Sequence, residues 1–437
     1  MSEVIIVGGG FAGLSAGVSL AAEGVKVTLL ERRKHLGGRA RSFTDNRTGD
    51  TVDNGQHLLM GCYYETRAFL EEIGTSHNLI LQDQFNVDYL GPGGISTRLS
   101  FSRHLPPPIH ILAGFLRFSP IQLGDVLRLR NLKAELNSSV VSTLTVDEWL
   151  VKCNQSKKIR ESFWHPLCLS ALNQSPTEAP AEQLMEVVNQ AVMGPWEGAR
   201  MGYPGVGLSN LYTVAAASFI EKTGGRILLS TAADQIETCT DGVRLRTNRN
   251  GIIEGDWVVC ASPPHATARI LPDNQTTLKQ VLYEYTPSPI LSVNLWFDQP
   301  ITSKLFVALL EARMDWVFNK HALYSGRDNA SEGHISMVAS AAMHLIDKSD
   351  DELVAISMED LSSHFPGASQ ARLEYSLVVR ERHATFVLPA NQARPANKTC
   401  HQRILLAGDW TETGLPSTIE AAVVSGRSAA RICLEHH

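Results

Sequence analysis

The hydrophobic pattern of the first thirty residues predicts a strand, a helix and a second strand. A β-branched apolar run at residues 4–7 is typical of a buried parallel strand. Apolar residues then recur at helical spacing through Leu14 and Val18 until Gly24, and a second apolar run covers residues 25–30. Because this order within about thirty residues is that of a βαβ unit, the N-terminal segment predicts a parallel sheet.

The rest of the pattern divides the chain into regions of different character. Residues 86–103 alternate apolar and polar side chains around a Gly-Pro-Gly-Gly turn, as a hairpin does, and residues 105–190 are mostly helical. Short strands return at 225–261, a mixed region covers 265–385, and residues 403–433 predict a strand, a glycine turn and an Ala-rich helix. The helical region has expected boundaries at residues 106–108, Pro120, Pro166 and Pro176.

The composition is that of an ordinary globular protein, with 43% hydrophobic and 19% charged residues in a chain of 437. A net charge of −6 argues against a general nucleic-acid binder, which needs a basic face. Seven scattered cysteines lack metal or redox spacing, so we expect reduced thiols, no metal site and a cytoplasmic protein. No apolar stretch reaches the roughly 18 to 20 residues that a membrane-spanning helix needs.

The turn between the first strand and the first helix carries a dinucleotide-binding motif. Gly8, Gly10 and Gly13 match G-x-G-x-x-G, in which the glycines permit a tight turn, close approach of a pyrophosphate and close helix packing. The helix start offers N–H groups and a partial positive charge to the phosphates, and Glu31 is placed to accept both ribose hydroxyls. We expect the cofactor to contact Gly8, Gly10, Phe11, Ala12, Gly13, Glu31 and Arg32.

Two further motifs favour FAD over NAD. Residues 37–39 read Gly-Gly-Arg just beyond Glu31, and residues 408–410, Gly-Asp-Trp, precede Pro-Ser-Thr-Ile at 416–419. Both stretches resemble the flavin motifs of the amine oxidase and phytoene desaturase superfamily. The resemblance implies an acid at the ribityl or pyrophosphate region and a helix start that faces the flavin ring, where it stabilises negative charge on reduced flavin. Ser417 or Thr418 is also placed to cap that helix. These segments add Gly38, Arg39, Gly408, Asp409, Thr418 and Ile419 to the expected FAD contacts, and Ala233, in the middle of the chain, is a further expected contact.

Flavin motifs at both ends of the chain predict one domain assembled from separated segments. The expected fold class is α/β, with a discontinuous Rossmann-type FAD-binding domain of the amine oxidase and desaturase kind and an inserted, mixed α+β substrate domain. We expect the FAD-binding domain to comprise residues 1–85, 200–265 and 385–437. The substrate domain then comprises residues 86–199 and 266–384.

Three other stretches resemble one branch of that superfamily, the hydroxysqualene dehydroxylases of bacterial hopanoid biosynthesis. They are residues 52–63 with Asn-Gly-Gln-His, residues 163–173 with Trp-His-Pro-Leu, and residues 384–386. The resemblance implies a reductive dehydroxylation, in which the hydroxyl of hydroxysqualene leaves as water and reduced FAD supplies the hydride that gives squalene. Such a reaction needs an acid beside the leaving hydroxyl and a dry apolar tunnel for a long isoprenoid.

The same resemblance nominates residues for catalysis and substrate binding. It places the loop with Gln56 and His57 near the flavin ring, and histidine titrates near neutrality, although a purely structural hydrogen bond by His57 is an open alternative. No second dinucleotide fingerprint is present, so the electron donor that reduces FAD is not identified. The side chains expected to line the tunnel, with plain core packing as the alternative for each, are Phe115, Phe163, Trp164 and Leu167.

Residues 105–118 form an apolar segment that is flanked by Arg103 and Arg117 and is too short to span a bilayer. A squalene-like substrate dissolves in membranes, so one interpretation is a substrate entrance that dips into the inner face of the cell membrane. The other interpretation is a buried helix of the inserted domain. Both stay open at the level of the sequence.

Three other functions use the same architecture. A carotenoid or phytoene desaturase shares every cofactor motif and transfers hydride from substrate to FAD. An amine oxidase depends on a lysine-bound water and an aromatic pair beside the flavin, whereas Trp410 is the one aromatic of the final motif and no lysine is evidently placed. A non-catalytic prenyl-binding escort protein has a degenerate cofactor site, whereas the glycine, acidic and arginine positions are intact in this chain.

Overall fold

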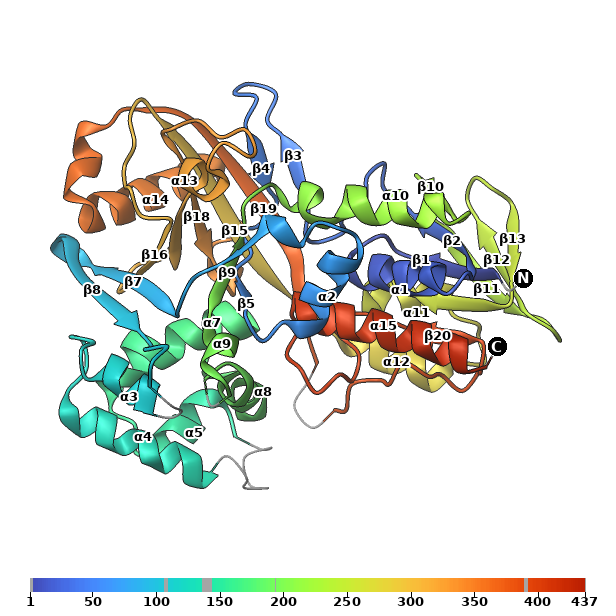
Figure 1. Cartoon of the computed structure of the whole chain (residues 1–437), viewed down its shortest axis with the longest axis horizontal. Helices are drawn as coiled ribbons and strands as arrows, with labels where there is room; N and C mark the ends of the chain where they lie inside the picture. The colour runs from blue at the N-terminus through green and yellow to red at the C-terminus, as the bar shows by residue number, and fades with distance from the viewer. Residues whose placement is uncertain (1–2, 106–108, 136–143, 193, 389–391, 437) are drawn as a thin grey trace.

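The computed structural model describes residues 3–105, 109–135, 144–192, 194–388 and 392–436. A parallel sheet and the helices from the two ends of the chain lie at the right of Figure 1, where both termini are marked. A larger, mainly antiparallel sheet lies at the upper left, and the teal and green helices of the middle of the chain lie below it. The chain therefore has two large sheets with a separate helical layer beside the second one.

The parallel sheet has five strands in the order β10-β2-β1-β14-β20, and every neighbouring pair is parallel. Its central strand is buried and almost entirely apolar, which is typical of a parallel sheet covered on both faces. The strands come from three separated parts of the chain. They are β1 (Glu3–Val7), β2 (Lys26–Glu31), β10 (Arg226–Leu229), β14 (Trp257–Cys260) and β20 (Ile404–Leu406).

Strand β1 supplies side chains to two different cores. Val4 and Ile6 pack with helices from one face of the sheet, and Ile5 and Val7 pack with a small antiparallel sheet and two helices on the other. Full burial of each of these side chains stabilises the fold by about 1.5–3 kcal/mol. The first face carries α1 (Phe11–Ala22), α10 (Val214–Lys222) and α15 (Ile419–Glu435), and the second carries α11 (Pro264–Ile270), α12 (Thr276–Glu284), β11 (Ala233–Thr238), β12 (Val243–Thr247) and β13 (Ile252–Gly255).

The second large sheet has seven strands in the order β19-β15-β18-β17-β16-β7-β8. The hairpin predicted at 86–103 is confirmed as β7 and β8, and only the pairing of β16 with β7 is parallel among the pairings of the described strands. The two long strands β15 and β19 fall in the region that the sequence pattern left as mixed. The strands are β7 (Asn86–Gly91), β8 (Ile95–Ser100), β15 (Thr286–Phe297), β16 (Phe306–Leu309), β17 (Trp316–Asn319), β18 (His334–Ala339) and β19 (Leu373–Val387).

The middle of the chain folds into helices, as predicted, but one predicted boundary is wrong. Residues 157–172 form a continuous helical segment that passes through Pro166. A π-helical turn at Arg160–Trp164 ends just before the proline, which then occupies the first turn of α7, where its missing N–H breaks no hydrogen bond of that helix. Pro120 and Pro176 lie between helices as predicted, and residues 106–108 lie outside the described residues. The helices are α3 (Ile109–Phe115), α4 (Leu123–Glu135), α5 (Val146–Lys152), α6 (Lys157–Ile159), α7 (His165–Leu172), α8 (Ala181–Val187) and α9 (Trp196–Ala199).

Short elements join these layers and complete an α/β fold with an additional mixed part, as the sequence predicts. A three-stranded sheet has the order β5-β9-β6, and β3 pairs with β4. The exact domain bounds given by the sequence stay a prediction. The joining elements are β3 (Ser42–Thr44), β4 (Thr51–Asp53), β5 (Leu59–Met60), α2 (Tyr64–Glu72), β6 (Leu79–Leu81), β9 (Met201–Pro204), α13 (Lys320–Tyr324) and α14 (Asp350–His364).

Candidate functional site

One cavity extends from the parallel sheet to the antiparallel sheet and α7. Gly8, Glu31 and Gly408 line it at or just beyond the carboxyl ends of β1, β2 and β20, where parallel α/β sheets bind their ligands. The same cavity is lined by the apolar side chains of Phe163 and Phe318. A ligand bound at the sheet and an apolar molecule at the other end would therefore share one continuous cavity.

The glycine turn has the shape that a pyrophosphate requires. Gly8 has φ +118°, and a Cβ on Gly13 would lie 1.9 Å from the carbonyl oxygen of Gly8, so helix α1 packs too closely there for any side chain. A Cβ on Gly10 would instead meet no described atom nearer than the Gly37 oxygen at 4.0 Å. No side chain among the described residues caps α1 at Gly10. The turn thus leaves open space beside helical N–H groups, which fits a phosphate group.

Glu31 holds the turn and also faces the cavity. Its carboxylate accepts hydrogen bonds from the N–H of Gly9 and the N–H of Arg33, each at 2.9 Å. A carboxylate has about four acceptor positions, so about two remain for ribose hydroxyls. Arg32 and Ala233 also line the cavity, as do Phe11 and Ala12. The structure therefore brings together the residues predicted for the adenosine half of a dinucleotide.

Arg39 and Asp409 join the two ends of the chain across this part of the cavity. The Arg39 guanidinium forms a bidentate pair with the Asp409 carboxylate, with Nη1 3.1 Å from Oδ2 and Nη2 in contact with Oδ1. Arg39 Nη1 also donates to the carbonyl oxygen of Ala384 at 3.0 Å. Asp409 is buried, so this pair fixes the β20 turn and the Gly38 loop against each other.

Helix α15 begins at the cavity. Thr418 is its N-cap, and its Oγ1 accepts a hydrogen bond from the N–H of Ala421 at 3.2 Å. Ser417, Thr418 and Ile419 all line the cavity. The capping role foreseen for Thr418 therefore occurs, and the positive end of a 17-residue helix faces the space that a flavin would need.

Gln56 belongs to a buried polar cluster that the sequence did not reveal. Its Oε1 accepts a hydrogen bond at 2.6 Å from the Nζ of Lys320, the first residue of α13. Lys320 is 1% exposed and also donates to Asp53 Oδ2 at 2.7 Å. The sequence signal for Lys320 is weak, because one lysine after the stretch Trp-Val-Phe-Asn is equally typical of a strand end at the surface.

His57 has a defined tautomer. Its Nδ1 lies 2.8 Å from the carbonyl oxygen of Gly55, which can only accept, so Nδ1 carries the proton and Nε2 is left as an acceptor. Burial lowers the pKa of His57 and outweighs the carboxylates of Asp53 and Glu381, which favour the charged form. At neutral pH this neutral ring therefore offers Nε2 as an acceptor and carries no proton there to donate.

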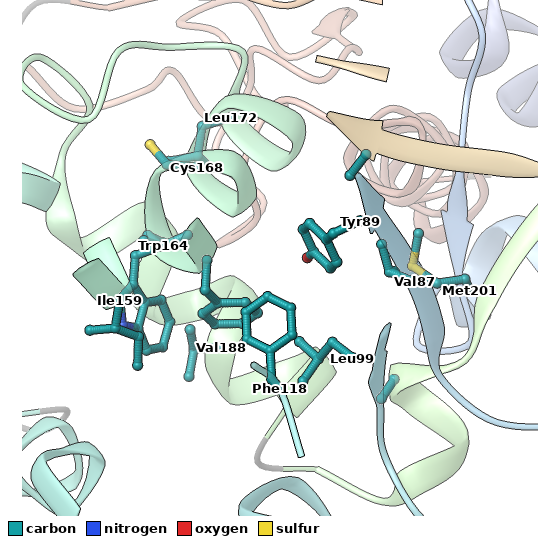
Figure 2. Packing of buried hydrophobic residues seen from close by; sticks show 14 of the residues in the cluster. Val87, Tyr89, Leu99, Phe118, Ile159, Trp164, Cys168, Leu172, Val188 and Met201 are labelled. Atoms are coloured by element: carbon teal, nitrogen blue, oxygen red, sulfur yellow. The ribbon is translucent and has the colours of Figure 1, made fainter. Parts of the chain in front are cut away.

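The apolar end of the cavity is built from α7, the π-helical turn before it and the second sheet. Phe163 and Leu167 line it, whereas Phe115 and Trp164 are each 2% exposed and lie behind it. The rings of Phe115 and Trp164 pack edge-on against Phe163, at centroid distances of 4.8 and 4.7 Å. Figure 2 shows the labelled Trp164 on the helical side and Tyr89 on β7 opposite. Two of the four predicted tunnel residues thus form the wall, and two support it.

Comparisons with known proteins agree on one family. The sequence profile described as flavin containing amine oxidoreductase matches residues 11–434. The chain is 28% identical over 99% of its length to hydroxysqualene dehydroxylase of Sinorhizobium fredii, covering 98% of that protein, and 26% identical over its whole length to that of Zymomonas mobilis, covering all of it. It is also 25% identical over 99% of its length to a 15-cis-phytoene desaturase of Glycine max, covering 79% of that protein.

Solved structures share the fold over the whole chain. An oxidoreductase from Methanosarcina mazei has a TM-score of 0.76 at 18% identity, with 98% of this chain and 100% of that chain covered. Cyclohexylamine oxidase from Brevibacterium oxydans has a TM-score of 0.71 at 19% identity, with 100% and 99% covered. These matches confirm the predicted amine-oxidase-like fold class.

Proposed function

Because this chain belongs to the flavin containing amine oxidoreductase family, we propose that it uses FAD to reduce hydroxysqualene to squalene. The predictions of FAD as the cofactor and of an oxidoreductase are confirmed by that membership. The substrate rests on the full-length relatives that carry the name hydroxysqualene dehydroxylase. We assign FAD to the glycine turn, Glu31, the Arg39–Asp409 pair and the start of α15.

Each part of the cavity has a task in this reaction. Reduced FAD, when bound, supplies a hydride to the carbon that loses its hydroxyl, and with one proton the hydroxyl leaves as water. Phe163, Leu167 and Phe318 line the other end of the cavity and exclude water from an apolar chain. The buried Gln56 amide and the Nε2 acceptor of His57 provide polar contacts on the same cavity wall.

The continuity of the cavity is the observation that carries this proposal. A dinucleotide cradle and an apolar chamber in one continuous cavity suit hydride transfer between FAD and a long hydrocarbon. The test is product analysis by gas chromatography after anaerobic incubation of the reduced protein with hydroxysqualene, with oxidised protein and phytoene as the parallel reaction. Squalene from the first mixture supports the proposal. Desaturated product from the second mixture, with no squalene from the first, would move the assignment to a desaturase.

A phytoene desaturase is the second candidate function. It is favoured by relatives of that name that match 99–100% of this chain at 24–25% identity. Those proteins are longer, since the chain covers 78–80% of them, whereas it covers 98–100% of the hydroxysqualene dehydroxylases. The difference in coverage favours the dehydroxylase.

We also propose that α3 and α4 contact an anionic membrane surface, from which the apolar substrate enters. Ile109 of α3 and Leu116, which directly follows that helix, are 52% and 58% exposed, and Leu123 and Leu127 of α4 are 63% and 59% exposed. Phe115, on the buried face of α3, packs against the cavity-lining Phe163. Both helices lie together at the lower left of Figure 1, away from the two termini. Among the described helices, none is long and apolar enough to cross a membrane.

Vesicle binding tests the membrane contact. Leu116→Glu with Leu123→Glu is expected to lower partitioning onto phosphatidylglycerol-containing vesicles more than tenfold, because burial of each leucine contributes about 1.5–3 kcal/mol. The matched control is Val214→Glu with Ile252→Glu, which removes two apolar side chains that are 64% and 56% exposed in other parts of the fold. Equal loss of binding in both pairs would contradict a contact through α3 and α4.

A further inference from the structure

Lys320 is a charged side chain in the interior of the protein, 1% exposed. Its Nζ donates to Asp53 Oδ2 at 2.7 Å and to Gln56 Oε1 at 2.6 Å, and it lies 4.3 Å from the centroid of the Tyr324 ring. Two hydrogen bonds and one cation–π contact thus surround the ammonium group of Lys320. Because these contacts hold its Nζ in place, the buried Lys320 side chain has a fixed orientation as well as a charge.

Asp53 balances the charge of Lys320 and accepts three hydrogen bonds in total from the described residues. Its Oδ2 accepts from Lys320 and from the Tyr324 hydroxyl, the latter at 3.0 Å, and its Oδ1 accepts from the N–H of Leu208 at 3.0 Å. The carboxylate is thus tied to α13 and to the chain that follows β9. It comes three residues before Gln56, so the ion pair anchors the start of the loop that lines the cavity.

The ammonium group of Lys320 determines the orientation of the Gln56 amide, that is, the positions of its oxygen and its nitrogen. Because an ammonium only donates, the atom 2.6 Å from Lys320 Nζ must be the amide oxygen, and the amide nitrogen lies on the other side. Gln56 Nε2 is buried and has no hydrogen-bond partner among the described residues. Gln56 lines the cavity, so its two N–H groups are donors that lack a protein acceptor.

We propose that Lys320 is a positioning residue that holds the Gln56 amide in one orientation, with its N–H groups donating to an acceptor atom of the bound flavin ring. A donor fixed in this way stabilises the form of the ring with more electron density, which is the reduced form. Lys320 therefore raises the reduction potential of FAD through Gln56. This inference depends on FAD binding and not on the identity of the substrate.

The test compares midpoint potentials of bound FAD, measured without substrate by photoreduction in the presence of a reference dye. Gln56→Met removes the donor at similar length. Asp53→Asn with Lys320→Met removes both members of the ion pair, so the net charge around the flavin is unchanged and a neutral pair replaces the ionic one. The third variant combines all three substitutions. FAD content and thermal unfolding are recorded for each protein before its potential is measured.

We expect a more negative potential in Gln56→Met, with about a tenfold loss in the equilibrium ratio of reduced to oxidised flavin, or about 30 mV for two electrons. The neutral-pair variant should shift in the same direction, and the combined variant should shift no further than Gln56→Met, because Lys320 acts through Gln56. An unchanged potential in the neutral-pair variant, or shifts that add, would overturn the proposal. If the variant with Asp53→Asn and Lys320→Met does not fold, Asp53→Asn with Lys320→Gln takes its place. An unchanged potential in that variant, or additive shifts, would again overturn the proposal.

Tyr324→Phe is the matched control. It removes the hydroxyl that donates to Asp53 and leaves the bonds from Lys320 to Asp53 and Gln56 in place. This substitution should lower the unfolding temperature and leave the midpoint potential of bound FAD equal to that of the unaltered protein. A potential that follows the unfolding temperature across all variants would mean that the cluster acts on structure only, which contradicts a positioning role.

Discussion

The two ends of the cavity are built in different ways. The cofactor end uses backbone groups and short-range motifs, with Gly8, Gly10 and Gly13 in one turn and Glu31 after the next strand. The apolar end uses side chains such as Phe163 and Phe318, which come from a helix and a strand far apart in the chain. Local backbone geometry therefore specifies the cofactor, whereas the substrate is selected by a surface that exists only after long-range folding.

A side chain that fills the cofactor end of the cavity should have the strongest consequence, which is the loss of bound FAD. Gly10→Val introduces a side chain into open space at a residue with ordinary extended backbone, so the apoprotein should fold while FAD affinity falls at least a hundredfold. The measurement is flavin content and FAD titration of the apoprotein. The control is Gly124→Val, because a Cβ there meets nothing within 4 Å among the described residues. Normal FAD content in Gly10→Val would refute the assigned pyrophosphate position.

A side chain that fills the apolar end of the cavity should lower substrate turnover and leave FAD binding unchanged. Ala171→Phe places a ring in the cavity from α7, so turnover of a long isoprenoid should fall tenfold to a hundredfold with the flavin spectrum and FAD affinity unchanged. The matched control is Leu169→Phe, on the same helix but not on the cavity wall. Comparable activity in the two variants would show that substrate does not occupy this end.

The smallest expected effect is on stability in acid. Burial holds the pKa of His334 well below its usual value, so the folded ring stays neutral while the unfolded ring gains a proton below about pH 6.5. The unfolded state then binds more protons, and stability falls as pH drops, by at most about 1.4 kcal/mol per pH unit from this residue. His334→Gln should reduce the decrease in the free energy of unfolding between pH 7 and pH 5, as measured by urea unfolding. If the free energy of unfolding depends on pH equally in both proteins, His334 does not cause the loss of stability in acid.

The sequence predicted the βαβ unit, the hairpin at 86–103, the α/β fold class and FAD, because each depends on a local pattern. It did not reveal Lys320, whose burial results from contacts with Asp53 and Gln56, more than 260 residues earlier in the chain. It also did not separate Phe163 from Phe115, since the same apolar side chain serves as cavity wall or as support. Helix periodicity indicates which face is buried, but not whether protein or ligand covers it.

The most direct test of this account is a single anaerobic turnover. Photoreduced, FAD-loaded protein is mixed with hydroxysqualene, the flavin absorbance is followed, and the extracted lipid is quantified. Reoxidation of the flavin is expected, with one squalene formed for each FAD, because one cavity brings hydride donor and substrate together. Flavin that stays reduced in the presence of hydroxysqualene, with no squalene in the extract, would contradict it.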